Sequence, residues 1–361
     1  MGYSITTSRG TSLTSLPIVQ EVQEAKVDED PSESLRRFVS GFWVSCALQV
    51  VTKLRVADYL TEIPLRSEEL ALLTETHSQS LYRLLRALSS VGVFAEDENK
   101  YFSLTTMGKL LISDGPRSLR SFVLEELDEA PGQTWEDLLW SVKTGRPARV
   151  AGRAFESRHI SKRSKAMHPK NAERLGGVAA LLRAAILRDY DFSSVKRIVD
   201  IGGGDGTFLA FLLQAHEPLV GVVFDYPWKV KETQLRLATE GVTKRCRVIV
   251  GNFLESVPSG HDMYVLRQIV HDYTDKEAVQ ILKNCQQAML PHSRLLFIES
   301  VIPPGNTLSL TKLRDLKLMI FSNGHERTEA ELCSLLRKAE LRAVRLMPLD
   351  SEVCLIEAVR G

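Results

Sequence analysis

The chain has 361 residues, of which 44% are hydrophobic and 25% charged, and its formal net charge is +1 at pH 7. These values are ordinary for a globular protein and exclude a strongly basic chain whose overall field would attract nucleic acid or an anionic membrane. Five scattered cysteines form no C-x-x-C pair, no stretch approaches eighteen consecutive apolar residues, and the N-terminus has no secretory pattern. We therefore expect reduced thiols, no membrane span and a cytoplasmic protein.

The N-terminal part of the chain is predicted to be a tail followed by a helix. Residues 1–32 are rich in Ser, Thr, Glu and Asp and are expected to form a disordered tail. In the helix that follows, Phe38, Phe42, Cys46 and Val50 recur at every fourth position. Apolar residues cover more sides of this helix than a lone surface helix needs, which predicts burial against another helix or another chain.

A compact helix–helix–hairpin pattern follows. Helices are predicted over 67–74 and 80–91, and a two-stranded wing over 94–104. This order is typical of a winged helix, a fold often used to bind DNA. The wing carries three acidic residues at 96–98, and the net charge of the chain is near zero. Both facts favour packing or dimerisation over DNA binding.

Residues 146–174 are the least regular segment, with nine Lys or Arg residues against two acidic ones and no clear period. We expect a solvated loop there. From residue 195 onward, apolar runs alternate with helical patterns, which predicts a mainly parallel sheet flanked by helices. The predicted strands are 195–201, 219–225, 246–250, 263–270 and 294–300, followed by an antiparallel hairpin of 342–348 and 353–359.

The turn after the first of these strands is rich in glycine. Asp200 precedes Gly202 by two residues, and a dinucleotide-binding turn would have its last glycine where this chain has Thr207. An acid in this place suits the amino-acid end of S-adenosylmethionine. Asp225 lies 21 residues after Gly204, close to the spacing at which a carboxylate reaches ribose hydroxyls. On this pattern alone, a dinucleotide site and a tight turn without a ligand remain alternatives.

Acidic and basic residues also follow later strands. His271 is expected at the end of the fourth strand, and Glu299 at the end of the fifth. In open α/β sheets the ligand crevice lies beyond the carboxyl ends of the strands. We therefore expect Asp200, Asp225, His271 and Glu299 to ring one crevice. Glu326 lies in a loop able to fold over the same crevice.

With these residues assembled, the chain resembles the small-molecule O-methyltransferases of the plant caffeate and hydroxyindole (acetylserotonin) type, with their bacterial and fungal relatives. The resemblance implies an α-helical winged-helix dimerisation domain over 33–145 and a segment over 146–190 that contributes to the acceptor pocket. It also implies a Rossmann-like catalytic domain over 191–361, with a mainly parallel sheet and an antiparallel last strand. It rests on the motifs Gly41-Phe42-Trp43-Val44-Ser45, Leu81-Tyr82-Arg83-Leu84-Leu85-Arg86, Val199-Asp200-Ile201-Gly202-Gly203-Gly204, Phe224-Asp225-Tyr226-Pro227, His271-Asp272-Tyr273 and Gly324-His325-Glu326-Arg327-Thr328.

The same resemblance implies a catalytic group. His271 is the expected general base, with Glu299 and Glu326 holding and polarising its imidazole. Asp272, which follows His271 in the same motif, is the fourth expected catalytic residue. An imidazole of ordinary pKa, about 6.5, is a sufficient base for a phenol near a sulfonium charge, whereas an aliphatic alcohol is much harder to activate.

The implied cofactor is S-adenosylmethionine, with S-adenosylhomocysteine as product and no metal. The implied partners are a small aromatic acceptor and a second copy of the chain, joined through the N-terminal domain, with no nucleic acid and no membrane. The expected cofactor-binding residues are Asp200, Gly202, Gly204, Asp225, Asn252, Phe253 and Arg267.

Three departures from the family pattern keep other functions open. The chain has Asn252 where the family usually has Asp, Tyr273 where it usually has Trp, and the basic segment 146–174 where aromatic and methionine side chains normally cover the acceptor. One alternative is carbon or nitrogen methylation, or pericyclic chemistry, with the same cofactor. The other is a dimeric binding protein whose active site has decayed.

Overall fold

The structure is a computed structural model that describes residues 30–115, 117–127, 131–148, 178–349 and 352–361. The predicted tail, apart from residues 30–32, and most of the basic segment 146–174 lie outside these residues. Contacts divide the chain into a unit of residues 1–44 and a unit of residues 45–361. No helix within the described residues is both long and apolar enough to cross a membrane.

The first helix, α1 (Pro31–Lys53), begins three residues earlier than predicted and belongs partly to each unit. Its N-terminal apolar side chains are exposed: Phe38 is 80%, Phe42 50% and Trp43 69% accessible within the single chain. Among the described residues, these three side chains are thus not buried, so the predicted burial of this face stays a prediction.

The winged-helix pattern is confirmed. Helix α3 (Ser67–Thr74) coincides with the prediction, and α4 (Ser78–Ser90) starts two residues earlier. Strands pair antiparallel in the order β1–β3–β2, with the wing formed by β2 and β3. The remaining described elements before the main sheet are α2 (Val56–Tyr59), β1 (Leu65–Arg66), β2 (Phe94–Glu96), β3 (Tyr101–Leu104), η1 (Gly108–Leu111), α5 (Arg120–Leu127), α6 (Pro131–Thr144) and α8 (Val178–Asp189).

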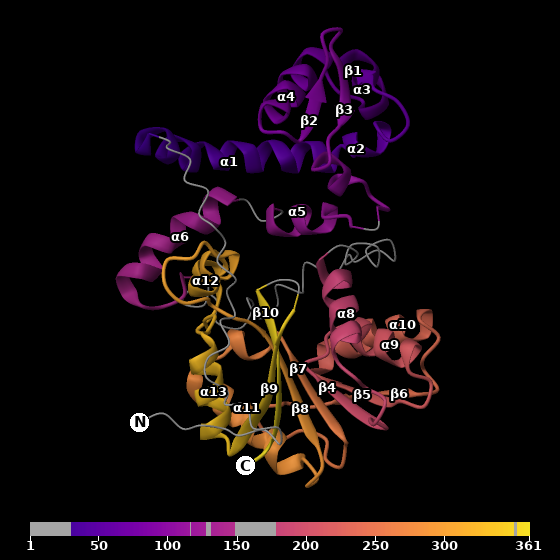
Figure 1. Cartoon of the computed structure of the whole chain (residues 1–361), viewed down its shortest axis with the longest axis vertical. Helices are drawn as coiled ribbons and strands as arrows, with labels where there is room; N and C mark the ends of the chain where they lie inside the picture. Colours follow the sequence, from indigo (N-terminus) through magenta and orange to yellow (C-terminus); the bar gives the residue numbers. More distant parts are fainter. Residues whose placement is uncertain (1–29, 116, 128–130, 149–177, 350–351) are drawn as a thin grey trace, which may run out of the picture. The chain divides into compact units, whose positions relative to one another are not determined.

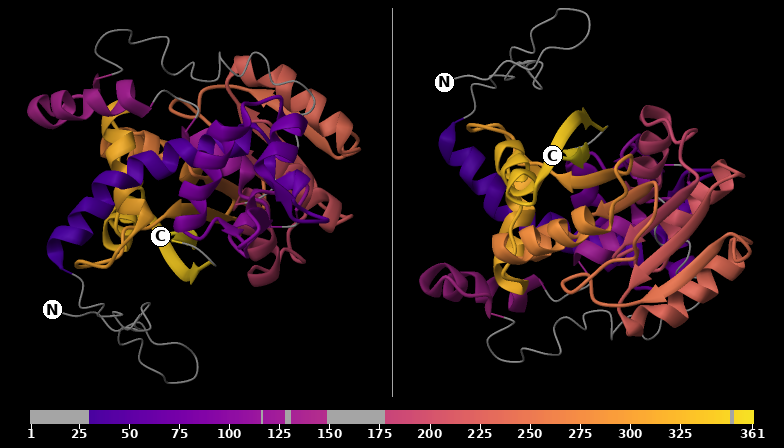
Figure 2. Two further views of the ribbon diagram at one scale, coloured as in Figure 1. Left: turned by 90° about the horizontal axis from the view of Figure 1, so that it is seen from above. Right: turned by 90° about the horizontal axis from the view of Figure 1, so that it is seen from below.

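A seven-stranded sheet in the order β6–β5–β4–β7–β8–β10–β9 forms the C-terminal part (Figure 1). The neighbours from β6 to β8 pair in parallel, and β10 pairs antiparallel with both β8 and β9, which confirms the predicted architecture. The hairpin lies at one end of the sheet and β6 at the other (Figures 1 and 2). The strands are β4 (Arg197–Ile201), β5 (Val220–Asp225), β6 (Cys246–Val250), β7 (Met263–Arg267), β8 (Arg294–Ser300), β9 (Leu341–Pro348) and β10 (Val353–Arg360).

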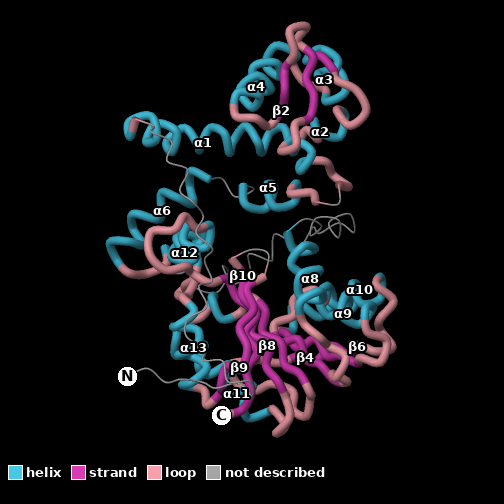
Figure 3. Tube along the Cα trace, viewed as in Figure 1, coloured by secondary structure: helices cyan, strands magenta, loops and turns pink. Residues whose placement is uncertain are grey.

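Alternating side chains of the strands bury the two faces of this sheet in separate cores. Ile198 packs in a cluster with residues of α8, α9 (Thr207–Ala215) and α10 (Val230–Thr239). Its neighbour Val199 packs in the opposite cluster, with α11 (Asp275–Ala288) and α13 (Glu329–Lys338). Successive side chains of a strand point to opposite faces of the sheet, and helices cover both faces. Figure 3 shows the strands with helices on either side of them. Helix α12 (Leu310–Phe321) precedes α13.

One strand boundary was predicted wrongly. The strand expected over 263–270 ends at Arg267, because Gln268 adopts a left-handed backbone conformation with φ of 52°. A 3-10 turn, η5 (Val270–Asp272), follows, so His271 lies in this turn rather than at the end of the strand. The left-handed residue turns the chain toward the neighbouring strand β8 and so affects where His271 lies.

Candidate functional site

The glycine turn brings a buried carboxylate against bare backbone. Asp200 lies in β4 and is 1% exposed. A Cβ atom built on Gly203 would lie 2.7 Å from Asp200 Oδ2, so only glycine leaves room for that oxygen. Gly202 and Gly204 have φ values of 67° and 60°, in the left-handed region that glycine adopts without strain.

Asp200 is poised to pair with a cation. Its Oδ2 atom has no hydrogen-bond partner among the residues that the structure describes. Burial raises the pKa of Asp200 to about 7, an effect that Arg267 opposes and Asp225 reinforces. A buried carboxylate without a partner is costly, and a cationic ligand group would remove that cost. This observation fits the sulfonium and ammonium charges of S-adenosylmethionine.

Asp225 and the glycine turn are brought together as predicted. Asp225 ends β5, and its Oδ2 accepts a hydrogen bond from Gly204 N at 2.8 Å while its Oδ1 accepts one from Tyr226 N at 2.7 Å. Burial raises the pKa of Asp225, although these two bonds favour the charged form. The carboxylate is thus fixed in orientation, and each oxygen keeps a lone pair for a further donor such as a ribose hydroxyl.

Aromatic rings line the neighbouring strand end. Tyr226 stacks on Trp228 with ring centroids 4.5 Å apart, and it packs against Phe253 at 4.9 Å. Phe253 is 3% exposed. Asn252, expected to contact adenine, is engaged locally: its Oδ1 accepts from the Tyr226 hydroxyl and Leu254 N, and its Nδ2 donates to Glu255. The amide therefore holds the aromatic Tyr226 in place.

Arg267, the last residue of β7, lies near this carboxylate cluster. Its guanidinium stands 5.1 Å from the centroid of the Phe208 ring of α9. Arg267 contributes to the electrostatic surroundings of Asp200, and no described residue offers a hydrogen-bond acceptor to its Nε atom. An anionic ligand group would satisfy that donor.

His271 is the centre of a second cluster. Its Nδ1 atom lies 3.3 Å from Glu299 Oε2 and 3.8 Å from Glu326 Oε2. Its Nε2 atom lies 3.6 Å from Asp272 Oδ1, beyond hydrogen-bond distance. Burial lowers the pKa of His271, but the carboxylates of Glu299, Asp272 and Glu326 outweigh it and raise the pKa to about 9. The structure thus brings all four predicted catalytic residues together.

The two buried glutamates are held differently. Glu299 Oε1 accepts the N–H groups of Ile269 at 3.0 Å and Val270 at 2.8 Å, the residues that follow the left-handed Gln268. Both side-chain oxygens of Glu326 lack a hydrogen-bond partner within the described part of the chain. Burial raises the pKa of Glu326 to about 7, against the pull of protonated His271.

Three residues that shape this cluster were missed by the sequence reasoning. Gln268 gives no sequence signal of its left-handed conformation. Gly324 and Arg327 stand in a motif that the sequence analysis quoted only for Glu326. A Cβ atom on Gly324 would lie 1.9 Å from the carbonyl oxygen of His271, and Arg327 is 2% exposed.

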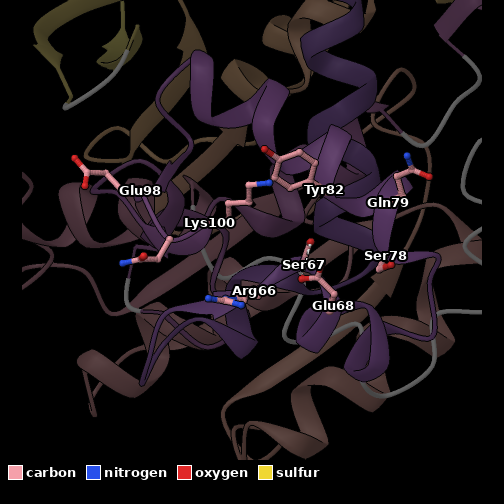
Figure 4. Close-up of a pocket in the computed structure, with 9 residues that line it drawn as sticks. Arg66, Ser67, Glu68, Ser78, Gln79, Tyr82, Glu98 and Lys100 are labelled. Carbon is pink, nitrogen blue, oxygen red and sulfur yellow. Dashed lines mark hydrogen bonds between the residues drawn. The ribbon is translucent and has the colours of Figure 1, made fainter.

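A cavity of about 360 Å³ lies elsewhere, in the winged-helix segment (Figure 4). Its walls include Arg66, Glu68, Tyr82 and Lys100, and Lys100 Nζ lies 5.7 Å from the Tyr82 ring centroid. The lining contains none of the predicted site residues, so this cavity is separate from the carboxylate and histidine clusters.

Comparison with known proteins identifies close relatives along most of the chain. A family model for the O-methyltransferase domain matches residues 135–342, and one for the O-methyltransferase dimerisation domain matches residues 37–114. Phenazine O-methyltransferase PhzM of Lysobacter antibioticus is 33% identical over 329 residues, which cover 91% of this chain and 96% of the relative. The 8-amino-8-demethylriboflavin N,N-dimethyltransferase of Streptomyces davaonensis is 33% identical over 326 residues, or 87% and 91% of the two chains.

A solved structure with a similar sequence identity to this chain supports the fold. CalO1, a methyltransferase in calicheamicin biosynthesis whose crystal structure is an S-adenosylhomocysteine-bound form, shares 30% sequence identity with this chain. The superposition covers 92% of this chain and all of CalO1, with a TM-score of 0.79.

Proposed function

Because the chain belongs to the family of O-methyltransferases that carry a dimerisation domain, we propose that it methylates a hydroxyl group, phenolic in character, of a small aromatic or secondary metabolite. S-adenosylmethionine, when bound, supplies an electrophilic methyl group on a positively charged sulfur. The observation that carries the proposal is the buried cluster in which His271 Nδ1 faces the carboxylates of Glu299 and Glu326.

His271 is the general base in this proposal. We propose that the neutral imidazole carries its proton on Nδ1, the nitrogen that lies nearer the two carboxylates, and presents the lone pair of Nε2. Asp272 does not hydrogen-bond Nε2 at 3.6 Å, so this atom can accept the proton of the acceptor hydroxyl. Holding the nucleophilic oxygen in line with the methyl group supplies much of the remaining acceleration.

The raised pKa of His271 changes the expected protonation state. At about 9, rather than the ordinary value near 6.5, the imidazole of the ligand-free protein is mostly protonated at pH 7. Proton transfer from a phenol of pKa about 10 to such a base is only slightly uphill, since one pKa unit corresponds to about 1.4 kcal/mol. The base must first lose its own proton, and a cation in the crevice favours that loss.

The cofactor-binding roles follow from the first cluster. We assign Asp200 to the cationic part of S-adenosylmethionine, Asp225 to its ribose, and Phe253 with Asn252 to its adenine. Arg267 is assigned to its anionic part. Gly202 and Gly204 provide the backbone approach. These assignments are supported by the unpartnered Asp200 Oδ2 and Arg267 Nε atoms and by the fixed carboxylate of Asp225.

Assembly and location belong to the same proposal. We propose a cytoplasmic homodimer that forms through the N-terminal domain and binds neither nucleic acid nor membrane. The family match over residues 37–114 and the exposed apolar side chains of α1 support the dimer. No metal is given a role, because His271 accepts the proton directly.

Nitrogen methylation is the second candidate, favoured by the similarity to an N,N-dimethyltransferase. Calorimetric titration of the purified chain with S-adenosylhomocysteine tests the shared premise, and binding at one site per chain is expected. Paired phenol and aniline acceptors with the same ring then separate the two reactions. Methylation of phenols supports the proposal, methylation of anilines alone supports the second candidate, and a folded dimer without binding supports a decayed site.

A further inference from the structure

Arg327 is the bulkiest side chain that the described core buries almost completely. It follows Glu326 in the chain and is 2% exposed. A buried guanidinium is costly unless each of its donors finds an acceptor. Its acceptors therefore show which parts of the structure depend on it.

The guanidinium of Arg327 holds both sides of the turn that carries the proposed base. Its Nη1 donates to Val270 O at 3.0 Å, and its Nη2 donates to Tyr273 O at 2.9 Å. These two carbonyls bracket His271 and Asp272 in the chain. The Nε and Nη2 atoms also donate to Asp275 Oδ1, at 3.0 Å and 2.8 Å.

The same residue is attached to the strand that carries Glu299. Its backbone forms a parallel bridge with Val301, and Ile302 N donates to Arg327 O at 2.9 Å. Its Nη1 also donates to His325 O at 3.3 Å, on the far side of Glu326. Arg327 thus joins the turn of His271, the loop of Glu326 and the extension of β8.

We propose that Arg327 is a positioning residue that keeps His271 within reach of both Glu299 and Glu326. The planar guanidinium donates to a carbonyl of each loop, Val270 O and His325 O, and the pair of His325 Nε2 with Asp275 Oδ1, at 3.7 Å, joins the same two segments. Lysine has three donors on one atom and cannot span these acceptors. The inference rests on the proposed function, in which His271 is the base. Its main test measures the pKa of His271 and needs no methyl transfer.

The charge of Arg327 and its positioning role predict opposite effects on His271. Removing a nearby positive charge alone would leave the pKa of His271 unchanged or raise it. Releasing the turn would move the imidazole away from the carboxylates and lower that pKa. The groups that face His271 are Asp272, Glu299 and Glu326, and Arg314 and Asp315 lie near Glu326.

Histidine NMR of the full chain without ligand measures this pKa directly. We expect about 9 in the natural protein, a fall toward about 6.5 in Arg327→Met, and a smaller fall in Arg327→Lys and Asp275→Asn. Arg294→Met is the control, because it removes a half-exposed arginine that pairs with the buried Glu357 at the opposite end of β8. It should leave the pKa of His271 unchanged.

Two results would overturn the positioning role. One is a folded Arg327→Met whose His271 pKa stays at or above that of the natural protein. The second result applies if Arg327→Met does not fold. It is a His271 pKa that stays at or above that of the natural protein in both Arg327→Lys and Asp275→Asn. Failure of the proposed function can be told apart from failure of the positioning role. If the natural protein shows the raised pKa of His271 but transfers no methyl group, only the catalytic assignment is contradicted.

Discussion

At the scale of single residues, the site contains two carboxylates that share a histidine but have different surroundings. Glu299 is held by two backbone N–H groups, whereas no described residue donates a hydrogen bond to either oxygen of Glu326. A proton can therefore reside on His271 or on Glu326 near neutral pH, because the pKa values of both are raised. The carboxylates thus raise the basicity of the imidazole.

The first residue-scale prediction concerns the base itself. Replacement His271→Ala should reduce methyl transfer at least ~100-fold, the usual contribution of a positioned general base. Affinity for S-adenosylhomocysteine should stay unchanged, since the cofactor residues lie in the other cluster. Steady-state kinetics and calorimetry measure the two quantities. His292→Ala, at an exposed histidine, is the control, and normal turnover in His271→Ala would refute the assignment.

A second prediction separates the charge of the cofactor from its shape. Binding of S-adenosylmethionine should lower the pKa of His271 from about 9, because the sulfonium is a nearby positive charge. S-adenosylhomocysteine has nearly the same shape and a neutral sulfur, so it should lower this pKa much less. Histidine NMR titrations of the two complexes give the comparison. Equal pKa values in both complexes would mean that the sulfur does not bind near His271.

The third prediction uses the buried carboxylate of Asp200. A raised folded-state pKa means that its contribution to stability is fully present below the ordinary value of 3.8 and is lost as pH rises through about 7. Between pH 5 and pH 7, the unfolding free energy of the natural protein should therefore fall by about 2–3 kcal/mol relative to that of Asp200→Asn. Urea denaturation of the cofactor-free proteins at several pH values measures it. Parallel pH profiles for the two proteins would show that Asp200 titrates normally.

At the scale of secondary-structure elements, the site depends on a strand that stops early. If β7 continued to residue 270 as predicted, Ile269 and Val270 could not both direct their N–H groups at Glu299. The left-handed Gln268 ends the strand and turns these groups toward β8. The loop of Glu326 then packs directly on the turn of His271, with Gly324 at the contact.

The element-scale prediction tests this close packing. Replacement Gly324→Ala places a Cβ atom 1.9 Å from the carbonyl oxygen of His271, so the two loops must separate. We expect a loss of about 1–3 kcal/mol in unfolding free energy, typical of overpacking, and a large fall in methyl transfer. Denaturation and kinetics check both. Gly305→Ala is the control, at a glycine with no atom near the added methyl group; it has a positive φ, so only stability should fall there.

At the scale of the whole molecule, the N-terminal part of α1 carries exposed apolar side chains among the residues that the structure describes. Phe38, Phe42 and Trp43 are exposed by half or more of their surface. A large exposed apolar patch usually marks an interface, and the family match over residues 37–114 is to a dimerisation domain. The predicted covering of this helix is consistent with a second copy of the chain.

The corresponding prediction is a change of assembly. Phe38→Glu combined with Trp43→Glu should convert a dimer into a folded monomer, because each replacement places a charge in an interface that would exclude water. Sedimentation velocity measures the mass, and circular dichroism confirms folding. Leu72→Glu, at an exposed leucine of α3, serves as the control. A dimer that survives the double replacement would place the interface elsewhere.

The sequence by itself determined the order of the strands and helices and the acidic residues that end the first two strands of the main sheet. Asp200 and Asp225 were found because glycine spacing and apolar runs are local signals, and the alternation of strands and helices predicted the sheet and its antiparallel strand. The family motifs added His271, Glu299 and Glu326.

Only the tertiary structure decided how these groups act on one another. The pKa of His271 depends on burial and on carboxylates from three separate elements, and these distances are not written in any local pattern. The left-handed Gln268 and the buried contacts of Arg327 likewise exist only once β7, β8 and the loop before α13 are packed together. Short-range preferences select elements, whereas desolvation and electrostatic coupling arise from contacts between residues distant in the chain.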